Sequence, residues 1–233
     1  MEVHHQHKPI HNWREFAKEV GIIVLGVMIA LGGEQAVEAI HHHYEVRDLE
    51  AALNQEVAFD LTSMKESVEL VPCVNRRLDE LEHWQRSFAQ DRRLKLAGEI
   101  GTPATRILRT SVWRSATGNA ADLMPFDRRM TYALFYDSVD FHAQIRSRAD
   151  AAFDDLSLLE HAQTLNQDQQ LRITHDVRTI RVAYRMLQQD YTTWLNTYAS
   201  ALHVAPDPNK LPAASEQGLD EARSTFCKPL LAS

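Results

Sequence analysis

Hydrophobic positions divide the chain into one continuous apolar segment and several later faces of helical spacing. The apolar segment covers residues 20–33, which alone are too few to cross a bilayer, since a span takes about 20 helical residues. Asn12 and Glu15 have the spacing of a capping box, so a helix can begin at Trp13, and residues 16–37 then form a segment of sufficient length. This pattern predicts a single membrane-spanning helix.

Other interpretations of the same segment stay open. Residues 30–32 fit the cleavage site of a signal peptide, and a short apolar run also suits a buried or an interfacial helix. Residues 1–19 balance acidic against basic side chains and lack the positive excess of a signal peptide. We therefore favour a retained anchor.

Helical periodicity continues beyond the anchor. One face steps by three or four residues as far as Val71, so a single helix of about 90 Å is expected, with Gly32-Gly33 as the predicted bend. Pro72 suits the first turn of a second helix. The positions of the first face are Leu49, Leu53, Val57, Leu61, Met64, Val68 and Val71, and those of the second are Val74, Leu78, Leu81, Trp84 and Phe88.

Two further long helices and two short ones follow a loop predicted for residues 91–110. Ser111 is the predicted cap of a short helix ending at Gly118-Asn119, Pro125 opens a long helix, and another begins near Asp168. A last short helix covers residues 216–226. The face of the first long helix is Phe135, Val139, His142, Ile145, Ala149, Ala152, Leu156 and Leu159, and that of the second is Ile173, Val177, Ile180, Tyr184, Leu187, Tyr191, Trp194, Tyr198 and Leu202.

These elements predict an all-α fold: an N-terminal transmembrane helix that continues into an antiparallel helical bundle with long helices. The expected organisation is a flexible cytoplasmic tail (1–11), a transmembrane anchor (12–44), a periplasmic helical bundle (45–204), and a linker and C-terminal tail (205–233). Few glycines and prolines, 8 of each, also favour helices over a turn-rich β fold.

Basic residues predict the orientation of the anchor. Residues 1–19 contain Lys8, Arg14 and Lys18, whereas residues 34–53 contain only Arg47. Because Lys and Arg are enriched on the cytoplasmic side, the N-terminus is expected in the cytoplasm and the bundle in the periplasm, outside a bacterial inner membrane.

Two cysteines agree with this location. Cys73 and Cys227 are far apart in sequence, and in an oxidising compartment such a pair predicts a disulfide. It would close a loop of about 154 residues, for which the chain-entropy model gives roughly 5 kcal/mol of stabilisation. Two independent buried thiols are the alternative.

The anchor resembles the N-terminal segment of a large group of bacterial (proteobacterial-type) single-pass inner-membrane proteins that have no established activity. The resemblance implies the anchor and its location but no chemistry. Its residues are Trp13-x-Glu15-Phe16-x-x-Glu19 and Gly26-Val27-x-x-Ala30-Leu31-x-x-Glu34, with shorter matches at Cys73-Val74-x-Arg76-Arg77-Leu78, residues 113–125 and Cys227-x-Pro229.

Candidate contact residues lie in the anchor. Gly26 and Ala30 have the small-x-x-x-small spacing that permits close contact between membrane helices, unless they are incidental small residues, and Glu34 follows one turn later. The run 41–43 contains three adjacent histidines, whose side chains diverge on a helix and cannot ligate one metal. Only pairs one turn apart, Glu38 with His42 or His41 with Glu45, could contribute to a site completed by a second copy.

Candidate contact residues in the bundle are two tryptophans and a basic stripe. Trp84 and Trp113 either pack into the core or line a pocket with the 91–110 loop. Arg178, Arg181 and Arg185 either pair with acidic residues of the preceding helix, such as Asp137 and Asp140, or bind an anionic partner.

Charge and motifs narrow the functions. A net charge of −7 argues against a nucleic-acid partner, and no catalytic, phosphate-binding or zinc motif stands out, so we expect no enzyme, cofactor or metal. The favoured hypothesis is a structural or interaction subunit whose partners are the bilayer and a second copy or another envelope protein. The alternatives are a ligand-binding or sensing ectodomain that works through a partner, and a divalent-metal binder that uses the histidines near the membrane.

Overall fold

The computed structural model describes residues 13–89, 94–116, 119–208 and 216–231, and it is helical in most of them. The chain forms two compact units, Met1–Asp48 and Leu49–Ser233. The expected cap at Asn12 and the predicted tail of residues 1–11 lie outside the described residues, as does Gly118.

Helix α1 (Trp13–Glu69) is the long helix that the periodicity predicts. It stays helical through Gly32-Gly33, where the sequence predicts a bend. Leu70 alone separates it from α2 (Val71–Ala89), and Pro72 lies in the first turn of α2, where its missing N–H leaves no bond unmade.

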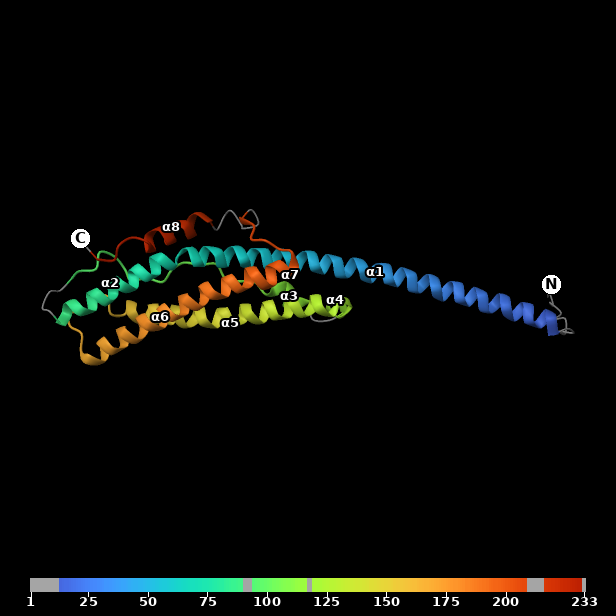
Figure 1. Cartoon of the computed structure of the whole chain (residues 1–233), viewed down its shortest axis with the longest axis horizontal. Coiled ribbons are helices and arrows are strands. Elements are labelled where there is room, and N and C mark those ends of the chain that lie inside the picture. The colour runs from blue at the N-terminus through green and yellow to red at the C-terminus, as the bar shows by residue number, and fades with distance from the viewer. Residues whose placement is uncertain (1–12, 90–93, 117–118, 209–215, 232–233) are drawn as a thin grey trace, which may run out of the picture. The chain divides into compact units, whose positions relative to one another are not determined.

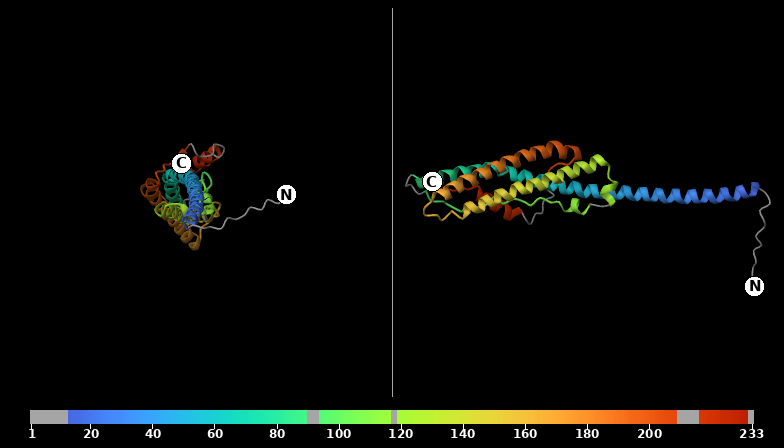
Figure 2. Two further views of the ribbon diagram at one scale, coloured as in Figure 1. Left: turned by 90° about the vertical axis from the view of Figure 1, so that its right-hand side faces the viewer. Right: turned by 90° about the horizontal axis from the view of Figure 1, so that it is seen from below.

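The second unit is an all-α bundle. The part of α1 after Leu49 runs beside α2, α5 (Phe126–Ser157) and α6 (Gln167–Thr193), and α5 and α6 pack side by side in antiparallel order (Figure 1, Figure 2). The predicted face of α5 is buried from Phe135 to Leu156, and so is most of the predicted face of α6. The 3.6-residue periodicity therefore identified the core correctly.

The ends of α6 show what periodicity does not encode. Asn166 caps the helix through a capping box with Gln169, so the helix begins just before the predicted Asp168. The final turns form a π-helix, η1 (Trp194–Ala199), followed by α7 (Ser200–Leu202). His203 ends the run in a left-handed conformation with φ 56°.

Two short helices follow the loop that crosses the bundle. Residues 94–110 have no regular secondary structure apart from an antiparallel bridge between Leu96 and Leu231. The helix α3 (Ser111–Ser115) ends before the predicted Gly118-Asn119, and a separate short helix α4 (Asn119–Leu123), which the sequence pattern did not predict, begins there.

A disulfide between Cys73 and Cys227 joins the C-terminal tail to the first turn of α2, as predicted. It directly follows α8 (Glu216–Phe226), which has the predicted bounds. Beside it, the buried Arg77 donates to the carbonyl oxygens of Glu99, Phe226 and Lys228. We call the disulfide and Arg77 the C-terminal clasp, because together they hold the loop and the tail against α2.

Candidate functional sites

The apolar half of α1 is exposed along its whole length. Every described side chain from Trp13 to His41 is exposed, including Ile22 at 72% and Ile29 at 67%. By length and composition this helix is long and apolar enough to cross a membrane. A soluble domain rarely presents so continuous an apolar surface to water.

Aromatic and charged side chains lie at the ends of this apolar stretch. The rings of Trp13 and Phe16 are 5.8 Å apart, and the guanidinium of Arg47 lies 4.8 Å from the ring centre of Tyr44. Amphipathic aromatic rings and long basic side chains are the residue types that occupy the two headgroup regions of a bilayer.

Gly26, Ala30 and Glu34 share one face of α1, because they are one turn apart. All three are exposed, and a Cβ atom placed on Gly26 would meet no atom within 4 Å. We call this the small-residue face. Its backbone is open to close approach by another helix.

The histidines after the apolar stretch pair with glutamates on their own helix. His41 Nε2 lies 3.1 Å from Glu45, and His42 Nε2 lies 3.8 Å from Glu38. No group of three or more His, Cys, Asp or Glu side chains in the described part of the chain is arranged to hold a metal ion.

Two buried carboxylates of α1, Glu56 and Asp60, bind the loop and α3. Glu56 is 5% exposed and accepts hydrogen bonds from the Ser111 hydroxyl and from the backbone N–H groups of Val112 and Trp113. The first turn of α3 is thus capped from another helix. Ser111, the predicted cap, uses its hydroxyl to reach Glu56, so that part of the prediction is wrong.

Asp60 is fully buried and accepts one hydrogen bond, 2.8 Å from the backbone N–H of Arg109. Its other carboxylate oxygen has no partner among the described residues. Burial, reinforced by the charge of Glu56, raises the pKa of Asp60 to about 8. The side chain therefore carries a proton at neutral pH.

Aromatic rings cover these carboxylates. Trp113 stacks on Tyr136 with ring centres 5.4 Å apart, and the buried Tyr132 donates to Asn54 of α1 at 2.6 Å. Burial, together with the neighbouring Glu56, raises the pKa of Tyr136. Trp113 is therefore a packing residue between α3 and α5.

Trp84 lies elsewhere in the bundle. It is 2% exposed, its ring meets Phe88 edge-on at 5.0 Å, and it lines a cavity of about 580 Å³ with residues 94–99. Trp113 does not line this cavity, so the structure does not bring the two tryptophans together.

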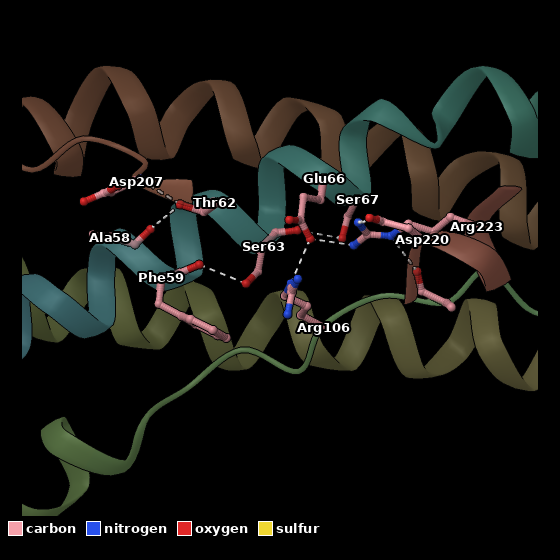
Figure 3. Close-up of polar contacts among 11 residues, drawn as sticks. Ala58, Phe59, Thr62, Ser63, Glu66, Ser67, Arg106, Asp207, Asp220 and Arg223 are labelled. Carbon is pink, nitrogen blue, oxygen red and sulfur yellow. Dashed lines mark hydrogen bonds and ion pairs between the residues drawn. The ribbon is translucent and has the colours of Figure 1, made fainter. Parts of the chain in front are cut away.

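Glu66 is the third acidic residue of α1 with a fixed role. Its Oε2 atom lies 3.0 Å from Arg106 of the loop and 2.6 Å from Arg223 of α8 (Figure 3). All three side chains are largely buried, at 18% exposure or less. One carboxylate therefore joins three segments that are distant in sequence.

A groove of about 730 Å³ runs between the 102–110 loop and α5. His142 and Arg146 lie in its wall. Burial lowers the pKa of His142 to about 3, and Arg146 binds Asp150 at 2.8 Å. The other arginines of the groove also have carboxylate partners, Arg106 with Glu66 and Arg114 with Asp140. The groove therefore offers little net charge to a ligand.

The basic stripe of α6 does not pair with α5 as a unit. Arg181 binds Asp79 and Glu82 of α2, at 2.9 and 3.2 Å. Arg178 lines a separate groove between α5 and α6, and Arg185 is exposed. The stripe is thus divided between a structural contact and an open surface.

Sequence reasoning missed Glu56, Asp60 and Glu66 as organising residues. A signal for the first two exists, since Glu56, Asp60, Ser63 and Ser67 form a polar stripe of helical spacing beside the apolar face of α1. All four are buried. A polar stripe beside an apolar one usually forms the solvent-exposed face of a helix. In α1 this stripe instead faces the loop that crosses the bundle.

Comparison of the chain with protein-family models, curated proteins and solved structures finds no match.

Proposed function

We propose that this chain is a single-pass protein of a bacterial inner membrane that presents its helical bundle in the periplasm as a scaffold or accessory subunit. The observation that carries the proposal is the apolar stretch of α1, exposed along its whole length and followed by a unit with its own core. Such a stretch needs a lipid or protein surface around it.

Two features support the periplasmic location. Basic residues are concentrated before the apolar stretch, which favours a cytoplasmic N-terminus. The disulfide between Cys73 and Cys227 is suited to an oxidising compartment, since cytosolic thiols are kept reduced.

The interaction role rests on how the polar groups are used. Glu56, Glu66 and Arg77 hold α3, the loop and the C-terminal tail in place, so these buried polar groups have a structural role. The small-residue face is the surface that an accessory subunit would use within the membrane, because it allows two helices to approach closely.

A topology experiment tests the location. Alkaline phosphatase fused after Ser233 should be active, and green fluorescent protein at the same site should be dark, with the chain remaining in the membrane fraction after a carbonate wash. The matched control replaces Lys8, Arg14 and Lys18 by Gln and adds three lysines after Tyr44, which should invert both signals. Release of the wild-type chain by carbonate, or an inactive phosphatase fusion, would refute the proposal.

A further inference from the structure

A second groove, of about 390 Å³, lies between α5 and α6, and we call it the α5–α6 groove. Its volume is within the range of small-molecule sites in proteins. Its main lining residues are the apolar Phe141, Ile145, Val182 and Met186 and the basic Arg148 and Arg178.

The apolar part of the groove is open to solvent. Phe141 is 50% exposed and Val182 is 45% exposed, although both belong to helices whose opposite faces form the core. Exposed apolar side chains that gather in a concave site mark a place where apolar ligand surface can be removed from water.

The two arginines differ from their neighbours in having no acidic partner. Arg146 and Arg181 form ion pairs with Asp150 and Asp79. Arg148 and Arg178 form no ion pair or hydrogen bond with any residue that the structure describes, and no acidic side chain lines the α5–α6 groove. Two guanidinium groups are therefore available to an anion.

The antiparallel register places Arg178 toward one end of the α5–α6 groove and Phe141 toward the other. His142 lies beside Asp190, and Arg146 lies over the ring of Tyr184, so higher numbers on α5 meet lower numbers on α6. Arg148 therefore lies about level with Val182, one helical turn from Arg178. Phe141 belongs to the end that holds Met186.

The length of the α5–α6 groove suits a single alkyl chain better than a helix of a partner protein. Its lining runs from Phe141 to Arg148 on α5, about 10 Å, and from His175 to Met186 on α6, about 16 Å at 1.5 Å per residue. A helix docked on this length would gain two to three turns of contact, and isolated short helices are marginal in water. An alkyl tail fills a trough of this length without any ordering of a backbone.

We propose that the α5–α6 groove binds a single-chain amphiphile with a carboxylate head. The head is held by Arg148 and Arg178, whose planar guanidinium groups match a carboxylate in two-point hydrogen bonding. The tail lies toward Phe141 and Met186. This site is independent of the membrane anchor and goes beyond the scaffold role.

Photolabelling of the full chain tests the site. A dodecanoic acid analogue with a diazirine at the end of its tail is added to the purified protein in phosphatidylcholine nanodiscs, and the labelled residues are identified by mass spectrometry. Label is expected within residues 141–145 or 182–186, with competition by dodecanoate and none by dodecylamine. Because the labelled residues are identified one by one, probe that partitions into the lipid does not obscure labelling of the groove. The labelling result can also be interpreted if the topology experiment gives a negative result.

Matched variants distinguish binding of the carboxylate head by Arg148 and Arg178 from a general effect of positive charge. The R148Q/R178Q variant should lose labelling about tenfold or more, because both charge-assisted contacts to the carboxylate are removed. R172Q/R185Q removes the same charge from exposed positions of α6 outside the groove and should label normally. R148K/R178K, which keeps the charge, should label at an intermediate level and guards against misfolding of the Gln variant.

Three results would overturn the proposal: label outside the α5–α6 groove or none at all, equal labelling of R148Q/R178Q and R172Q/R185Q, or competition by dodecylamine as strong as that by dodecanoate.

Discussion

Asp60 and His142 are both held uncharged by burial, and their effects on stability have opposite signs with pH. The pKa of Asp60 is raised to about 8, so its proton is bound in the folded chain but lost from the unfolded chain above about pH 4. Stability therefore falls as pH rises toward 8. The pKa of His142 is lowered to about 3, so stability falls as pH drops below about 6.5, where the unfolded histidine gains a proton.

Asp60→Asn isolates the first effect. Asparagine keeps an oxygen to accept from Arg109 and cannot ionise, so the variant should lose the decline between pH 6.5 and 8. Linkage sets the wild-type decline at about 1 to 2 kcal/mol over this interval. Chemical denaturation at the two pH values measures it.

The pH interval provides the control for that experiment. Between pH 6.5 and 8 only the end of the titration of the unfolded histidine remains, worth about 0.4 kcal/mol, so His142→Gln should keep most of the wild-type decline. A wild-type chain equally stable at both pH values would contradict the raised pKa of Asp60.

At the scale of elements, α3 depends on α1 for its first turn. The carboxylate of Glu56 accepts from the backbone N–H groups of Val112 and Trp113, both in the first turn of a helix of 5 residues. So short a helix has almost no stability of its own, because nucleation is costly. Its position on the bundle is set by Glu56 and by the stacking of Trp113 on Tyr136.

Glu56→Ala should lower the free energy of unfolding by about 1 to 2 kcal/mol, the usual cost of removing a helix cap. Glu56→Gln keeps one acceptor and should cost less. Measurement at pH 5.5, where Asp60 is protonated in both variants, excludes an effect through its pKa. Hydrogen exchange at Val112 and Trp113 should accelerate in the alanine variant, and unchanged exchange there would argue against the cap.

The elements that the sequence predicts are those whose information is local. Periodicity located α1, α5 and α6, and the helix at residues 216–226 was predicted at both ends. The cap of α3 was not predictable, because Glu56 lies 56 positions from Val112 in the chain. The π-helix at Trp194 was also missed, since a single inserted turn hardly changes the spacing of apolar residues.

At the scale of the whole molecule, one helix, α1, has an exposed apolar part and a part that belongs to the core of the bundle. Residues 13–41 expose their apolar side chains, whereas Leu53, Val57 and Leu61 are fully buried. An apolar side chain in α1 is thus exposed or buried in the core according to its position relative to residue 49. Amino-acid composition alone does not distinguish the exposed part of α1 from the buried part. The sequence pattern does, because a continuous apolar run changes to apolar residues at helical spacing.

The small-residue face should govern any association inside the membrane. Replacing Gly26 and Ala30 by Ile prevents close approach of a second helix there, and a Cβ atom at Gly26 has no side chain of this protein within 4 Å. Crosslinking in native membranes should therefore drop several-fold, while membrane insertion is kept. Ile substitution of Val24 and Met28 on other positions of the stretch is the matched control, and equal crosslinking of both pairs would exclude this face.

The C-terminal clasp also has a consequence for the order of events during synthesis. Cys227 lies 154 residues after Cys73, so the covalent bond cannot form until the segment around Cys227 has been synthesised. Until then Arg77 lacks the carbonyl oxygens of Phe226 and Lys228. Residues 226–228 thus complete the surroundings of the first turns of α2, and a free Cys73 thiol marks a chain in which this late segment has not yet been joined.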